Sequence, residues 1–220
     1  MSCYDFPFAS ARLTALPSGG LWWSERGILA VSDLHFGKSH RLTRKRSSLL
    51  PPHDNQETLT RLEHDILVRN PATIICLGDS FDDLAAVEEL DQADHRWLTC
   101  LMAGRRWIWI EGNHHPGPVD VGGTHLAEYR EAALTFRHIA DPDAQAEVSG
   151  HFHPKTRIKA MGRSISRPCF LLDDKRLILP AYGAFTGGLR SDAPVLRELM
   201  SPNSIAVLTG KLATPVPLEL

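Results

Sequence analysis

The chain has four cysteines, and no two of them are close in sequence. Cys3, Cys76, Cys100 and Cys169 form no Cys-x-x-Cys pair, which is the spacing used by zinc ribbons and thiol redox motifs. We therefore expect free thiols and no structural zinc held by cysteine.

Long apolar segments are also missing. The start, MSCYDFPFASARLTALPSGG, has neither the basic residues nor the apolar run of a secretory signal. No later stretch is long enough to span a membrane. A cytoplasmic protein without a membrane partner is the resulting expectation.

The composition shows no large excess of charge of either sign. The formal net charge is -2, so any surface for nucleic acid must be local. The sequence also lacks repeats and linkers rich in Pro, Gly or Ser. We expect a single domain over residues 1–220, in which 1–19 is an irregular leader and 211–220 is a C-terminal tail.

Strand and helix patterns alternate in the first half of the chain. Ile28 to Val31 form an uninterrupted apolar run, typical of a strand buried on both faces. A capping-box pattern at Asp54 predicts a helix that continues to Asn70, where a proline follows. The stretches ATIICLGD and WIWIEGNHH predict two further strands, with helical spacing over residues 90–105 between them.

From Thr124 onward the patterns are short and typical of strands. Alternation followed by a run of strands favours an α/β fold in which two sheets form a sandwich flanked by helices.

Polar clusters follow four of the predicted strands. They are Asp33-Leu34-His35, Gly78-Asp79, Gly112-Asn113-His114 and Gly150-His151-Phe152-His153. His138 follows a further strand and has His125 as a rival. Ligands gathered at the carboxyl ends of strands are expected to share one site.

Carboxylate, amide and imidazole groups favour Mn, with Fe or Zn as alternatives. A set of seven such ligands suits two divalent ions, which can clamp the attacking and leaving oxygens of a displacement at phosphorus.

The order DxH, GD, GNH, H, GHxH resembles that of the calcineurin-like metallophosphoesterases. The stretches SDLHFGK, LGDSFDD, FRHI, SGHFHP, RPCFLL and LPAYGAFTGGL are similar, more narrowly, to the bacterial ligase-associated DNA damage response endonucleases. That resemblance implies a calcineurin-like two-sheet β-sandwich flanked by helices and a role in DNA repair. It also implies DNA as substrate, with an ATP-dependent DNA ligase and a helicase as partners.

The resemblance also implies the ligand sets. One ion would be held by Asp33, His35, Asp79 and His153, and the other by Asp79, Asn113, His138 and His151. Asp79 would bridge the two ions. His114 would be the catalytic histidine, placed to protonate the leaving alkoxide.

His151 and His153 would then serve one ion each. On a strand, alternate residues point to the same face, and Gly150 would allow the turn that brings both rings inward. Asp82 could orient a ligand, although capping of a helix explains an acidic residue there equally well. His115 stands where the superfamily usually has Asp or Glu, so the pKa of His114 is left without that acidic neighbour.

The segment HRLTRKR places Arg41, Arg44, Lys45 and Arg46 shortly after the first cluster. These cations could contact phosphates, and a solvated loop is the alternative. For the whole chain, a DNA phosphodiesterase is the main hypothesis. A small-molecule phosphoesterase and a weakly catalytic, partner-binding subunit are the alternatives.

Overall fold

The computed structural model describes residues 2–38, 54–82, 90–113, 121–160 and 162–218. Its strands are β1 (Tyr4–Phe8), β2 (Ala11–Ala15), β3 (Leu21–Trp23), β4 (Ile28–Val31), β5 (Thr73–Leu77), β6 (Arg106–Ile110), β7 (Thr124–Leu126), β8 (Glu128–Glu131), β9 (Leu134–Arg137), β10 (Glu147–Ser149), β11 (Lys155–Ala160), β12 (Arg163–Leu172), β13 (Arg176–Ile178), β14 (Ile205–Leu208) and β15 (Thr214–Pro217). Its helices are the short η1 (Ser24–Arg26), α2 (Asp54–Arg69), α4 (Gln92–Met102) and α5 (Pro194–Leu199).

The first sheet contains β1 to β7 in sequence order. Strands β1 to β4 pair antiparallel, and β4 to β7 pair parallel. The parallel strands β4, β5 and β6 are almost entirely buried, as their continuous apolar runs predict. Their carboxyl ends therefore meet at one edge of the sheet.

The second sheet has the order β15-β14-β12-β13-β10-β9-β8, and β11 pairs with β12. Its strands β9, β10 and β13 run parallel, while the other pairs are antiparallel. The carboxyl ends of β9 and β10 thus also lie side by side.

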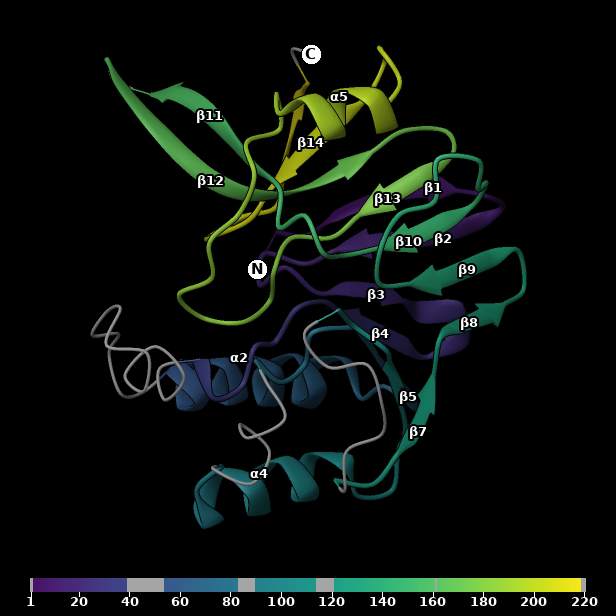
Figure 1. The fold of residues 1–220 in the computed structure, drawn as a ribbon, viewed down its shortest axis with the longest axis vertical. Coiled ribbons are helices and arrows are strands. Elements are labelled where there is room, and N and C mark those ends of the chain that lie inside the picture. Colours follow the sequence, from purple (N-terminus) through teal and green to yellow (C-terminus); the bar gives the residue numbers. More distant parts are fainter. Residues whose placement is uncertain (1, 39–53, 83–89, 114–120, 161, 219–220) are drawn as a thin grey trace.

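Three apolar clusters define the layers. The largest contains side chains of both sheets, such as Ile75 and Val148, and forms the centre of the sandwich. A second packs α2 and α4 against the first sheet, and a third packs α5 against the second sheet. Figure 1 shows α2 and α4 beside β4 and β5, with α5 at the opposite end of the molecule. The predicted α/β fold with two sheets flanked by helices is confirmed.

Two parts of the chain differ from expectation. Within the predicted irregular leader 1–19, β1 and β2 form a hairpin. Within the predicted tail 211–220, β15 pairs with β14. Both β1 and β15 are edge strands that contain proline, a residue that weakens the strand pattern in a sequence but is tolerated at a sheet edge.

Among the helices of the described residues, none is long and apolar enough to cross a membrane.

Candidate metal centre

The predicted ligands follow neighbouring strands of both sheets. Asp33 and His35 follow β4, Asp79 follows β5, and Asn113 follows β6. In the second sheet, His138 follows β9, and His151 and His153 follow β10. The two sheets therefore bring their parallel carboxyl ends together, and the candidate ligands gather between them.

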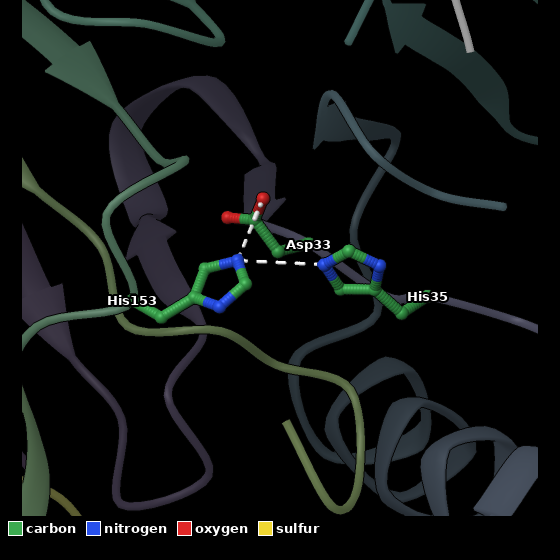
Figure 2. A group of neighbouring side chains, drawn as sticks. All are labelled: Asp33, His35 and His153. Atoms are coloured by element: carbon green, nitrogen blue, oxygen red, sulfur yellow. Dashed lines mark hydrogen bonds and ion pairs between the residues drawn. The ribbon is translucent and has the colours of Figure 1, made fainter. Parts of the chain in front are cut away.

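The first group of candidate ligands is Asp33, His35 and His153, whose ligand atoms all lie within 4.8 Å of one another. Figure 2 shows the three side chains converging. His153 Nε2 lies 3.1 Å from Asp33 Oδ1 and 3.4 Å from His35 Nε2. A carboxylate oxygen and two ring nitrogens thus face one small space, as the ligands of a cation do.

The buried Asp82 carboxylate lies beside the ring of His35. His35 Nδ1 lies 2.9 Å from Asp82 Oδ1. Because an ionised carboxylate only accepts hydrogen bonds, Nδ1 carries the proton in the neutral ring and Nε2 presents its lone pair to the group. This contact supports the orienting role predicted for Asp82.

The second group is Asp79, His138 and His151, again within 4.8 Å. His138 Nδ1 lies 2.9 Å from the carbonyl oxygen of Leu77, which fixes the proton on Nδ1. His138 Nε2 then faces Asp79 Oδ2 at 3.3 Å and His151 Nδ1 at 3.3 Å.

Asn113 joins this second group. Its Oδ1 lies 2.8 Å from His138 Nε2, next to the position that the resemblance implies for it. The two groups adjoin, because His138 Nδ1 is 3.9 Å from Asp33 Oδ1. His138 rather than its rival His125 lies at the site, since His125 is stacked on Trp109 with ring centroids 6.3 Å apart.

Burial and neighbouring charges decide the ionisation of the site. Burial raises the pKa of Asp33, but the hydrogen bond and charge of His153, with the charges of His138 and His35, outweigh it and leave that pKa lowered. Burial lowers the pKa of His138, yet Asp79 and Asp33 raise it overall. The pKa of His151 is lowered by burial and by the neighbouring His138. Ionised carboxylates and a neutral His151 are the forms that bind a metal.

Five of the seven candidate ligands have a left-handed backbone. Their φ angles are 53° at Asp33, 49° at His35, 42° at Asp79, 68° at His151 and 47° at His153. Such conformations cost about 1–3 kcal/mol each in non-glycine residues and persist where the surroundings enforce them. Concentration of this strain at one place favours a functional site.

The role predicted for Gly150 is wrong. Strand β10 ends at Ser149, and the left-handed residues are His151 and His153 rather than Gly150. Instead, a Cβ on Gly150 would lie only 2.6 Å from Asp33 Oδ2, so glycine permits the close approach of the two ligand loops. His151 N donates a 3.0 Å hydrogen bond to the same Oδ2 across this contact. Each histidine nevertheless belongs to a different group, as expected.

Sequence reasoning missed two supporting groups. Ser32 Oγ donates to Asp33 Oδ2, and the carbonyl of Leu77 fixes the tautomer of His138. The position of Ser32, directly before the first ligand, was a usable signal. The carbonyl of Leu77 could not be recognised from the sequence, because every residue has a backbone carbonyl.

The remaining predicted residues lie outside the described ranges. They are His114, His115, Arg41, Arg44, Lys45 and Arg46. Their roles stay predictions.

The donor groups fit divalent metal ions. Each group offers oxygen and nitrogen atoms, contains no thiolate, and includes a carboxylate that is almost completely buried. Buried charges of this kind are normally paired or bound to metal. The chain therefore has two adjoining candidate metal sites.

Comparison with known proteins agrees with this geometry. The family model for calcineurin-like phosphoesterases matches residues 27–137. The fold is similar to that of the nuclease MPE of Pseudomonas putida, with a TM-score of 0.76 and 24% sequence identity. The match covers 98% of this chain and 100% of that chain. No curated protein matches the sequence significantly.

Proposed function

The chain belongs to the calcineurin-like phosphoesterase family, and we propose that it is a dinuclear, metal-dependent phosphodiesterase that cleaves DNA. The observation that carries this proposal is the pair of adjoining ligand groups, one around Asp33 and one around Asp79. The similarity in fold to a protein named as a nuclease supports a nucleic acid as the substrate class.

Asp33, His35 and His153 would hold one ion, and Asn113, His138 and His151 the other, with Asp79 shared between them. Two divalent ions bound there would polarise the phosphodiester and favour in-line displacement. Mn is the expected metal, and Fe and Zn are the alternatives.

The side chains and backbone of the protein would orient the metal ligands and protonate the leaving group. Asp82 holds the lone pair of His35 Nε2 toward the site, and Leu77 does the same for His138 Nε2. We assign His114 to protonate the leaving alkoxide, a role typically worth 10²- to 10⁴-fold in rate. His115 follows it where a carboxylate usually stands, so His114 lacks that support for its protonated form.

The narrower assignment also remains a proposal. Similarity to the ligase-associated DNA damage response endonucleases favours endonucleolytic cutting in DNA repair in the cytoplasm. A DNA ligase and a helicase would be the partners. Contacts between phosphates and Arg41, Arg44, Lys45 and Arg46 belong to the same proposal.

Circular DNA tests this function. Purified protein loaded with Mn should cut single-stranded and supercoiled circles and hydrolyse a generic phosphodiester, and a chelator should abolish every activity. Circles have no ends, so cutting them requires an endonuclease.

Each alternative predicts a different result. Hydrolysis of the generic diester with intact circles would favour a small-molecule phosphoesterase. Metal binding without hydrolysis of any diester would favour a partner-binding subunit.

A further inference from the structure

A groove of about 620 Å³ runs along β11, outside the two ligand groups. Its polar lining includes Lys155, Thr156, Arg157, Arg190, Ser191 and Asp192. Figure 1 shows the β11–β12 hairpin projecting from the second sheet. The groove therefore lies between this hairpin, the segment that contains Arg190 and the edge strand β15 of the second sheet.

The groove begins next to a candidate metal ligand. Lys155, the first residue of β11, is two residues after His153, so their Cα atoms are at most about 7 Å apart. Lys155 N donates to the carbonyl of Leu189 at 2.8 Å, and Ser191 N donates to the carbonyl of Lys155 at 2.8 Å. These bonds place Arg190 in a parallel bridge with Lys155.

The geometry of β11 and its bridge partner places three cationic side chains on one face. Lys155 and Arg157 are two residues apart on β11 and share one face, and Arg190, as the bridge partner of Lys155, shares it too. Against these three cations the lining has one carboxylate, Asp192, which pairs with Arg190. Lys155 Nζ donates to the neutral carbonyl of Thr186 at 3.0 Å, a contact that leaves its charge uncompensated.

Cations two residues apart on a strand are separated by about 6.6 Å, a spacing comparable to that of successive phosphates along a nucleic-acid strand. Arg157 is four residues from His153, at most about 14 Å away, so a polymer strand that binds at the ligand groups could also contact it. We propose that this groove binds the phosphodiester backbone of a DNA strand next to the phosphate being cleaved. The inference rests on the proposed function and adds to it a path for the substrate.

Salt dependence of DNA binding tests the groove. Arg157→Ser combined with Arg190→Ser should flatten the plot of log affinity against log salt by about 1.4, since each contact to a single strand contributes about 0.7. Binding of a single-stranded oligonucleotide is measured over a salt series in EDTA. Arg157→Lys, which keeps the charge, should retain the wild-type slope.

Arg130→Ser is the matched control. Arg130 is an exposed arginine on β8, at the opposite edge of the second sheet from β15. Its replacement should leave the salt slope unchanged, and unaltered metal content of the groove variant would show that its site is intact. Equal slopes for the wild type and the groove variant would overturn the inference while leaving the nuclease proposal standing. A wild type that hydrolyses a generic diester but binds no DNA would overturn both.

Discussion

His35 lies between the carboxylate of Asp82 and the candidate metal position. The 2.9 Å contact of its Nδ1 with Asp82 Oδ1 fixes which ring nitrogen offers a lone pair. Without the carboxylate the ring could rotate, or carry its proton on Nε2, and either change would remove a ligand.

Asp82→Ala should therefore lower metal affinity by about 10- to 100-fold, the usual effect of losing a partner that orients a ligand. Isothermal titration of the metal-free protein with Mn measures this change, and activity should recover at high Mn. Asp82→Asn keeps an acceptor oxygen and should lose less affinity. Equal affinities for the wild type and the alanine variant would show that Asp82 does not orient His35.

Residue types made much of the site predictable. Asp, Asn and His side chains directly after apolar strands indicated metal ligands, and the structure gathers seven such residues, from Asp33 to His153. The sequence could not reveal that a carbonyl such as that of Leu77 would face a histidine, since such contacts depend on the path of the backbone.

The loops after β5 and β6 pack closely against each other, and this contact positions Asp79. A Cβ on Gly112, in the loop after β6, would lie 2.2 Å from the backbone N of Asp79, in the loop after β5. Because the obstructing atom belongs to the backbone, the loops would have to separate.

Gly112→Ala should cost about 1–3 kcal/mol of folding stability through overpacking and should also weaken metal binding by displacing Asp79. Urea unfolding and Mn titration measure the two effects. Gly187→Ala is the control, because a Cβ there meets no atom within 4 Å and φ is not left-handed. Unchanged Mn affinity in the Gly112 variant would mean that the position of Asp79 does not depend on this contact.

A buried carboxyl links α2 to the loop after β13. Asp65 Oδ2 accepts hydrogen bonds from Ser18 and from the hydroxyl of Tyr182, at 2.5 Å and 2.8 Å. Burial nevertheless raises the pKa of Asp65. At pH values between the ordinary Asp pKa of about 3.9 and the raised pKa of the folded state, the folded state binds more protons than the unfolded state.

This carboxyl should therefore contribute stability at low pH that is lost as pH rises through the folded pKa. The free energy of unfolding of the wild type minus that of Asp65→Asn should decrease with rising pH above about 4. Urea unfolding in EDTA at several pH values measures the difference. A difference that increases with pH would mean that the pKa of Asp65 is lowered.

The elements themselves were predictable where their patterns are long. The apolar strands β4, β5 and β6 and the helix α2 were expected close to their observed bounds. Within α2, Ile66 is buried while the next residue, Leu67, is 74% exposed, because one residue advances a helix by about 100°. The edge strands β1 and β15 were missed because proline weakens their pattern.

For the whole molecule, the sandwich is what assembles the site. The first sheet supplies Asp33, His35, Asp79 and Asn113, and the second supplies His138, His151 and His153. Neither sheet alone completes either group, since each group combines residues of both. The order of the clusters could be predicted from the sequence, whereas the distances between their side chains depend on how the two sheets pack.

The central claim is that the two groups hold two metal ions. Elemental analysis of the wild type, loaded with Mn and freed of excess metal, measures bound Mn per chain most directly. The account predicts two ions per chain, because each group brings one carboxylate and two imidazoles within 4.8 Å of one another. Saturation at one ion per chain, or at none, would contradict it.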